Sequence, residues 1–466
     1  MIIEQIYTKC LAQGAYYIES NGEAAVIDPL REPTPYIERA KKNKVKIKYI
    51  FETHIHADFV SGHLDLAKKT AATIVFGPNA NTHYDCYNAV DGETFKIGSM
   101  TLKVIHTPGH TLESVSYLLI DANGKNHALF SGDTLFLGDV GIPDVAQQYK
   151  DLSKEKLAEM LFESLRFKIM PLEDNIILYP AHGAGSACGK NMSKETFGKL
   201  GDQKSSNYAL RSDMTKEEFV SEVLKGIGSP PPYFIENISL NKTGYTDLDV
   251  ILSKSNTTLS VQLFEELIQK KETLVLDVRT QQEFVKSHIP GALFIGLNGD
   301  FAPWVGALIS DINKPILLVV PEGRSEEAIK RLARVGYDNS LGYLEGGMSA
   351  WVQAGKTTEQ IKSISVKEFE QRFNTKPIAV LDVRKDGEYN SMHLEGANVQ
   401  HLSLDSIHQK IQGIESQKTY HIYCGGGYRS VIAASILKAN GFSNIIDIAG
   451  GFAALEKTQL PMVNGV

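Results

Sequence analysis

The sequence predicts an α/β protein of three domains: a layered two-sheet domain followed by two copies of a parallel-sheet domain. The chain has 466 residues, and about 150 residues per domain is a common size. Up to residue 250, short apolar runs alternate with glycine-containing turns and helical stretches, as in a layered α/β fold. The rest of the chain contains an internal repeat. We therefore expect domains at 1–250, 256–356 and 361–466.

Composition and charge exclude several classes of protein. Hydrophobic residues make up 42% and charged residues 22% of the chain, which is typical of globular domains. The net charge of −7 gives no electrostatic reason to expect nucleic acid or an anionic membrane as a partner. Four widely spaced cysteines do not form a disulfide framework. With no secretory pattern and no long apolar run, we expect a cytoplasmic protein, and we also expect a homo-oligomer.

The internal repeat lies in the second half of the chain. The segments LVLDVRTQQEFVKSHIPGA and AVLDVRKDGEYNSMHLEGA align at one offset, which takes Asp277 to Asp382, 105 residues later. The same offset takes Arg324 to Arg429. Each copy alternates apolar runs of strand length with helical stretches, which predicts a parallel sheet flanked by helices.

Short loops before residue 190 carry histidines and aspartates directly after strand-like runs. They are His54, His56 and Asp58 in THIHADF, His110 in TPGHT, Asp133 in SGDTLF and His182 in YPAHG. Imidazole and carboxylate are ligands of first-row transition metals. The glycines beside two of these residues, Gly109 and Gly132, allow the backbone to turn sharply there. The pattern predicts a metal centre.

These motifs resemble the metallo-β-lactamase superfamily, and the resemblance covers nearly all of residues 1–250. It implies an αβ/βα sandwich, but the superfamily includes zinc hydrolases, lactonases and iron dioxygenases, so the fold does not choose a reaction. Its first motif usually ends in Asp-His, and this chain has Phe59 after Asp58. A second metal would have only Asp58, His182 and a share of Asp133. Two-metal hydrolysis needs ions held about 3.5–4 Å apart, so we expect one metal.

The one-metal pattern resembles the persulfide dioxygenases of this superfamily. The resemblance implies that one Fe(II) per chain is held by His54, His110 and Asp133. A two-histidine, one-carboxylate site leaves positions open for O₂ and a substrate thiolate. Three other residues would orient the ligands or add one: His56, Asp58 and His182. Zinc, with His56 as a further ligand, is the alternative.

A glycine-rich loop, CGGGYRS (424–430), follows an apolar strand and precedes a helix. Loop amides at a helix N-terminus form an anion cradle, which stabilises a thiolate and would stabilise a persulfide anion. The candidate catalytic residues are Cys424 and Arg429. The candidate anion-binding residues are Gly425, Gly426, Gly427, Tyr428 and Ser430.

Together with the repeated LDVR segment, this loop resembles the rhodanese family. The resemblance implies that Cys424 carries transferable sulfur and that Arg429 and the loop amides bind thiosulfate or a persulfide. The six-residue span from cysteine to arginine favours sulfur over phosphate, for which related folds use a longer loop. In the first copy, the repeat offset places Val319 at the cysteine position, and Pro321 removes one amide. That copy is expected to have a structural role.

The two halves together suggest iron-dependent oxidation of a low-molecular-weight thiol persulfide by O₂ to sulfite and thiol. Sulfur transfer through Cys424 would form or use thiosulfate. Cys188, six residues after His182, is either a core residue or a second sulfur acceptor near the metal. One alternative is a zinc-dependent thioester hydrolase of the glyoxalase II type with an accessory sulfurtransferase domain. Another is a sulfur-relay or sensing module with a structural metal. The thiol carrier is not identified.

Overall fold

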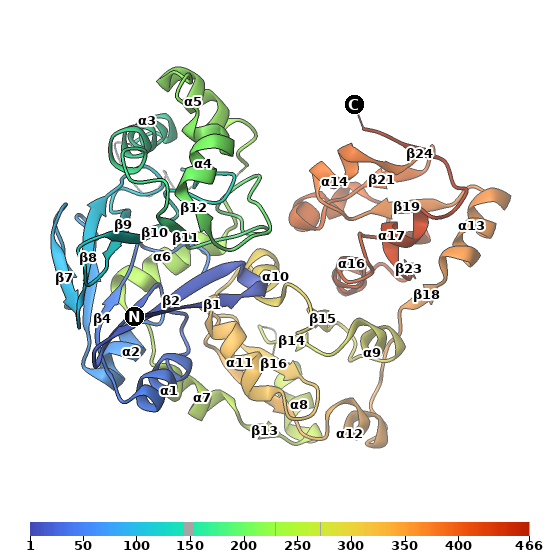
Figure 1. The fold of residues 1–466 in the computed structure, drawn as a ribbon. Coiled ribbons are helices and arrows are strands. Elements are labelled where there is room, and N and C mark those ends of the chain that lie inside the picture. The colour runs from blue at the N-terminus through green and yellow to red at the C-terminus, as the bar shows by residue number, and fades with distance from the viewer. Residues whose placement is uncertain (144–151, 229, 271, 466) are drawn as a thin grey trace. The chain divides into compact units, whose positions relative to one another are not determined.

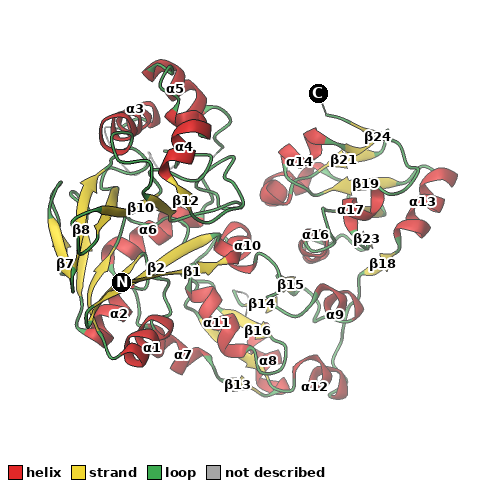
Figure 2. Ribbon diagram, viewed as in Figure 1, coloured by secondary structure: helices red, strands yellow, loops and turns green. Residues whose placement is uncertain are grey.

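The computed structural model describes residues 1–143, 152–228, 230–270 and 272–465. The chain divides into two compact units, one of residues 1–250 with 332–336 and the other of residues 251–331 with 337–466. Figures 1 and 2 show their helices and strands. Among the described residues, no helix has the length and apolar character needed to cross a bilayer.

The first unit is built on two six-stranded sheets. The first sheet has the order β1 (Ile2–Thr8), β2 (Gln13–Ser20), β3 (Glu23–Ile27), β4 (Lys46–Phe51), β5 (Thr73–Phe76) and β6 (Tyr87–Asn88). The second has the order β12 (Gly198–Lys199), β11 (Ile177–Pro180), β10 (Asn126–Gly132), β9 (Val115–Ile120), β8 (Met100–His106) and β7 (Thr94–Ile97). Each sheet is mixed: β3 to β6 are parallel, as are β10 and β11, and the other neighbours are antiparallel.

The two sheets pack face to face around an apolar core. Side chains from both sheets contribute, including Tyr16, Phe51, Tyr117 and Phe130. Successive strand residues point to opposite faces, so Leu118, next to Tyr117 in β9, belongs instead to the core on the outer face of the second sheet. That face is covered by helices, which makes the unit a sandwich with helices outside both sheets, as expected (Figure 1).

The helices of this region are α1 (Thr34–Asn43), α2 (His63–Thr70), α3 (Lys154–Ser164), α4 (Leu200–Ser206), α5 (Lys216–Leu224), α6 (Tyr233–Thr243) and α7 (Leu248–Ser255). Ser153 caps α3 by accepting from the amide of Lys156, and Thr215 and Glu218 form a capping box at the start of α5. Such caps satisfy amides that lack partners in the first turn. α2 packs against β4 and β5, whereas α3 packs against α5.

The second unit contains both copies of the repeat, each with a five-stranded parallel sheet. The first copy has the order β13 (Thr258–Leu259), β17 (Ser340–Leu344), β16 (Ile316–Val319), β14 (Leu274–Asp277) and β15 (Leu293–Phe294). The second has the order β18 (Lys362–Ile364), β23 (Ile445–Ile448), β22 (Tyr420–Tyr423), β19 (Ala379–Asp382) and β21 (Val399–His401). A short antiparallel pair, β20 (His393–Leu394) and β24 (Met462–Val463), accompanies the second.

Helices alternate with these strands. The first copy contains α8 (Val261–Ile268), α9 (Gln281–Lys286), α10 (Phe301–Leu308), α11 (Ser325–Ala333) and α12 (Gly347–Gln353). The second contains α13 (Val366–Thr375), α14 (Asp386–Ser391), α15 (Ile407–Lys410), α16 (Arg429–Ala439) and α17 (Gly451–Leu455). The expected fold class, a sandwich followed by two parallel-sheet domains, is confirmed. We propose 1–250, 256–356 and 361–466 as their boundaries.

The repeated LDVR segment makes the same buried ion pair in both copies. Arg279 Nη2 lies 2.6 Å from Asp277 Oδ2, and Arg384 Nη2 lies 2.6 Å from Asp382 Oδ2. Each arginine also donates to a backbone carbonyl eight residues further along the chain. Because a buried carboxylate needs a partner, the pair fixes the turn from β14 or β19 into the next helix.

We expect Phe130→Ala to destabilise the sandwich by about 3–5 kcal/mol, the usual cost of truncating a buried aromatic residue. Phe130 is fully buried and packs against Tyr16 and Tyr179. Hydrogen exchange of the β10 amides would measure the loss locally. Phe167→Ala is the matched control, because that ring is 73% exposed. Equal exchange in both variants would contradict this account of the core.

Candidate metal centre and persulfide loop

The predicted metal-binding residues all lie in loops that follow strands of the first unit. His54, His56 and Asp58 follow β4, His110 follows β8, Asp133 follows β10 and His182 follows β11. All six side chains are buried. Gly132 (φ +55°) permits close approach of two of these loops, because a Cβ there would lie 2.6 Å from the Cβ of Thr53.

The structure brings His54, His110 and Asp133 together. One ligand atom from each lies within 4.8 Å of the others. Asp133 Oδ2 is 3.8 Å from His54 Nε2 and 3.5 Å from His110 Nε2. Two imidazole nitrogens and a carboxylate oxygen that converge in this way are suited to a divalent transition metal.

Hydrogen bonds on the far side of both imidazoles leave each Nε2 free for a metal. His110 Nδ1 donates to the carbonyl of Ile142 at 2.7 Å. The Thr53 hydroxyl donates to Asp28 at 2.9 Å, so its oxygen accepts from His54 Nδ1 at 3.0 Å. Burial, and then the neighbouring His56, hold the pKa of His54 well below its ordinary value. The residues therefore fit a metal, and such outer hydrogen bonds orient histidine ligands in known sites.

His182 links this group to Asp58. Its Nδ1 lies 2.8 Å from Asp133 Oδ1, and its Nε2 lies 3.0 Å from Asp58 Oδ2. Burial lowers the pKa of His182, but the two carboxylates, Asp133 first, raise it overall to about 10. Burial acts to raise the pKa of Asp133. The imidazoles of His182 and His54 outweigh this effect and hold that pKa well below its ordinary value. His182 thus holds Asp133 in place as a carboxylate.

Cys188 joins Asp58 and His182 in a second group of candidate ligands. Its sulfur lies within 4.8 Å of a ligand atom from each, and the side chain is 3% exposed. Phe59 takes the place of the histidine that usually follows the motif aspartate. Its ring is fully buried and packs on the ring of His56, with centroids 4.3 Å apart. A thiol that completes the second set of ligands was not predicted from the sequence. The signal in the sequence that could have indicated this ligand is the position of Cys188, six residues after His182.

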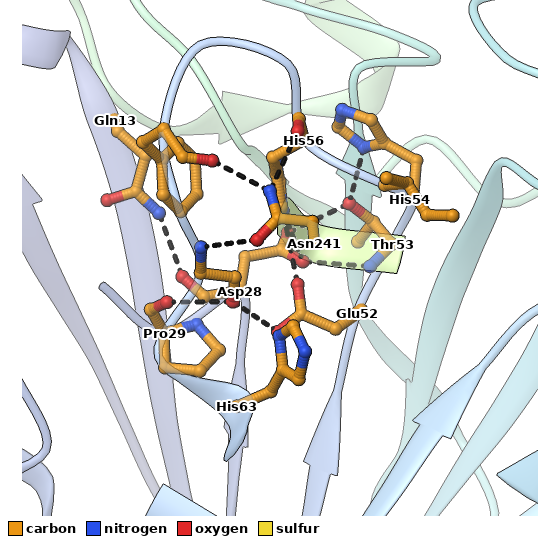
Figure 3. A network of polar contacts seen from close by, with 12 residues as sticks. Gln13, Asp28, Pro29, Glu52, Thr53, His54, His56, His63 and Asn241 are labelled. Atoms are coloured by element: carbon orange, nitrogen blue, oxygen red, sulfur yellow. Dashed lines mark hydrogen bonds and ion pairs between the residues drawn. The ribbon is translucent and has the colours of Figure 1, made fainter. Parts of the chain in front are cut away.

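His56 does not join the first group of candidate ligands. Its Nε2 lies 3.1 Å from Asp28 Oδ1 and 3.3 Å from Glu52 Oε2 (Figure 3). Burial lowers the pKa of His56, but these carboxylates, Asp28 first, raise it well above its ordinary value. The charged His56 ring thus lies between two acids, and Asp28, Glu52 and His56 form a further group whose ligand atoms lie within 4.8 Å of one another. The alternative in which His56 is a metal ligand stays a prediction.

A wider polar network holds the same loop (Figure 3). Glu52 accepts from the Ser61 hydroxyl and lies 3.2 Å from His63 Nδ1. The side-chain amide of Asn241, in α6, donates to the carbonyls of His56 and Phe59, both at 2.8 Å. None of Glu52, Ser61, His63 and Asn241 was predicted as a site residue from the sequence. Asp28 had a signal, because it directly follows the strand-like run AAVI.

In the second copy of the repeat, Cys424 lies between β22 and α16 and is 1% exposed. The amide of Gly427 (φ +97°) donates to Cys424 Sγ at 3.1 Å, and Ser430 Oγ is 3.6 Å from the sulfur. Tyr428 donates to the carbonyl of Gly296 in the first copy. The Cys424 thiol donates to Ser430 Oγ, and the Ser430 hydroxyl donates to Asp447 Oδ1. The donor that the loop places on the sulfur, as in an anion cradle, is the amide of Gly427.

Arg429 is engaged by a carboxylate. Its Nη1 donates to Glu388 Oε2 at 2.5 Å, and its Nη2 donates to Glu388 Oε1 at 2.7 Å. In the first copy, the corresponding arginine is Arg324, and the cysteine position holds the buried Val319. That copy has no thiol to carry sulfur.

Known protein families match both halves of the chain. The metallo-β-lactamase superfamily profile matches residues 9–84, and the rhodanese-like domain profile matches 260–354 and 365–458. A crystal structure described as a metallo-β-lactamase from Staphylococcus aureus is 30% identical, with a TM-score of 0.64, and the match covers 74% of this chain and 98% of that one.

Two curated relatives match the N-terminal part. Cytoplasmic hydroxyacylglutathione hydrolase of Arabidopsis thaliana is 31% identical over 38% of this chain. The match spans 66% of that protein, just under two thirds of its length. Glyoxylase B2 of Dictyostelium discoideum is 29% identical over 47% of this chain and 76% of that protein.

We expect Thr53→Val to lower metal affinity by about 10–100-fold, the usual effect of removing a hydrogen bond behind a histidine ligand. Valine matches threonine in shape but gives His54 Nδ1 no oxygen. Anaerobic competition with a chromophoric chelator would measure the change. Thr73→Val, on an exposed position of β5, should bind metal as the unaltered protein does. An unchanged affinity in Thr53→Val would exclude this role.

Proposed function

From a chain that joins a metallo-β-lactamase domain to two rhodanese-like domains, we propose an iron-dependent persulfide dioxygenase coupled to a sulfurtransferase. The observation that carries the proposal is the three-residue set of His54, His110 and Asp133, with His56 turned away to a pair of acids. Two histidines and one carboxylate are the ligands of many iron(II) oxygenases. A thiol in a rhodanese-type loop on the same chain supports sulfur as the common substrate.

The residues of the first unit would hold Fe(II) and position the persulfide. When bound, Fe(II) would supply the redox chemistry by which O₂ oxidises the sulfane sulfur. His54 and His110 offer Nε2, and their Nδ1 hydrogen bonds fix both rings. His182 orients Asp133, and the burial of all these side chains limits access of water. The net reaction converts a persulfide, O₂ and water to a thiol, sulfite and two protons.

Cys424 would carry sulfur in the second step. Its thiolate attacks the outer sulfur of a second persulfide, the S–S bond breaks, and the thiol leaves as a thiolate. Cys424 then holds a persulfide, which the amide of Gly427 is placed to stabilise. Attack by sulfite on the outer sulfur releases thiosulfate and restores the Cys424 thiolate. The first copy would pack against this domain, as the Tyr428 contact with Gly296 suggests.

A zinc-dependent thioester hydrolase of the glyoxalase II type is the second candidate function. Two observations favour it. The curated relatives include a hydroxyacylglutathione hydrolase, and Asp58, His182 and Cys188 offer three ligands for a second ion. In that case, the Cys424 domain would be an accessory sulfurtransferase.

Oxygen uptake separates the two functions. We expect protein purified without O₂ and loaded with Fe(II) to consume one O₂ per sulfite formed from glutathione, coenzyme A or bacillithiol persulfide. His110→Ala should abolish uptake, whereas His83→Ala, on an exposed histidine, should not. Rapid hydrolysis of a hydroxyacyl thioester by the zinc-loaded protein, without O₂ uptake by the iron-loaded protein, would contradict the proposal.

If Cys188 is a second sulfur acceptor beside the metal, Cys188→Ser should retain one metal and O₂ uptake but slow thiosulfate formation. A serine hydroxyl keeps the volume near Asp58 and His182 but cannot carry sulfane sulfur. Thiosulfate formation would be measured against Cys86→Ser, a partly exposed cysteine outside both sites, and Cys424→Ser should abolish it. Unchanged sulfur flux would exclude Cys188 as a sulfur acceptor, and loss of a second metal would support the hydrolase.

A further inference from the structure

Given the proposed role of Cys424 as a sulfur carrier, the charge around its loop affects which sulfur donors it accepts. The pair of Glu388 and Arg429 lies directly on the loop. A Cβ on Gly425, the residue after Cys424, would lie 2.9 Å from Arg429 Nη2 and 3.6 Å from Glu388 Oε1. Both terminal nitrogens of the arginine donate to the carboxylate. A bidentate pair of this kind fixes the guanidinium and compensates its charge.

The charged groups that act on Arg429 are all acidic. Besides Glu388, the charges of Cys424 and then Asp405 raise the pKa of Arg429, and Arg384 is paired with the buried Asp382. A cavity of about 80 Å³ beside Gly426 and Gly427 is lined by glutamines, small or apolar residues and one acid, and none of the described residues that line it is cationic. Arg429 and Arg384 thus face the carboxylates of Glu388, Asp405 and Asp382.

The first copy shows that this pairing is a property of the copy with the cysteine. Arg324, the equivalent of Arg429, donates to Glu327 on its own helix and to Asn298. Glu283 and its equivalent Glu388 both accept from the backbone amide at the start of their own helix, from Thr280 and Lys385 respectively, but Glu388 in addition binds the arginine of its copy. The repeat offset takes Glu327 to a buried isoleucine in the second copy, so Arg429 lacks the partner on its own helix and turns to Glu388.

We propose that the Glu388–Arg429 pair makes the Cys424 loop select singly charged hydropersulfides over dianionic thiosulfate as sulfur donors. With a hydropersulfide, the Cys424 thiolate takes the outer sulfur and a thiolate leaves. With thiosulfate, it takes the sulfane sulfur and sulfite leaves as a dianion. The second reaction brings two negative charges to a loop whose arginine is already compensated. Glu388 is therefore a positioning and selectivity residue, and sulfur flows from persulfide through Cys424 toward thiosulfate.

The test measures how fast each donor persulfidates Cys424 in the full-length, metal-loaded protein under anaerobic conditions. The donors are thiosulfate and 2-mercaptoethanol persulfide, and peptide mass spectrometry follows Cys424. Glu388→Gln keeps the shape and removes the charge, so the thiosulfate-to-persulfide ratio of second-order rate constants should rise by about tenfold, and the rise should shrink with added salt. Glu283→Gln, the same change in the first copy, should leave the ratio unchanged.

Three outcomes would overturn the proposal. One is an unchanged or lower ratio in Glu388→Gln, and another is an equal rise in Glu283→Gln. The third is a preference for thiosulfate in the unaltered protein. Glu388→Asp, which keeps the charge, should stay near the unaltered ratio and serves if Glu388→Gln does not fold. Failure of Cys424 to accept sulfur from either donor would instead refute the proposed function.

Discussion

The arrangement of the metal centre depends on one buried carboxylate, that of Asp28 at the end of β3. It accepts from both the amide and the hydroxyl of Thr53 and faces the ring of His56. Because Asp28 follows β3 and Thr53 follows β4, these contacts hold the loop after β4 against the end of β3. Because the Thr53 hydroxyl gives its proton to Asp28, its oxygen accepts from His54 Nδ1, and His54 Nε2 is left for a metal. The supporting carboxylate thus determines both the position and the tautomer of a ligand.

The fold class and the gathering of His54, His110 and Asp133 could be predicted, because the family resemblance implies that the loops after strands of both sheets converge, and these three residues lie in such loops after β4, β8 and β10. The orientation of His56 could not. Its spacing is that of a ligand, but buried acids on other segments compete for the ring, and a sequence pattern does not report such long-range competition. The spacing from His182 suggested that Cys188 lies near the metal, but its place beside Asp58 could not be predicted, because it depends on how a loop folds back.

The two repeat copies show how the same residue types acquire different roles. Both keep a glutamate and an arginine at matching positions, and the following helix has Glu327 in the first copy and an isoleucine at the same place in the second. In the first copy the arginine donates to a glutamate of the helix that follows it. In the second copy the arginine donates to Glu388 and lies against the cysteine loop. Retention of a family residue is therefore weaker evidence of its role than the identity of its partner.

The central claim is that this chain uses one ferrous ion held by His54, His110 and Asp133. Anaerobic titration of the metal-free protein with Fe(II), followed by equilibrium dialysis and metal analysis, tests it most directly. The account predicts tight binding that saturates at one ion per chain and is lost in Asp133→Asn. Saturation at two ions per chain, with Asp58 and Cys188 needed for the second, would contradict it.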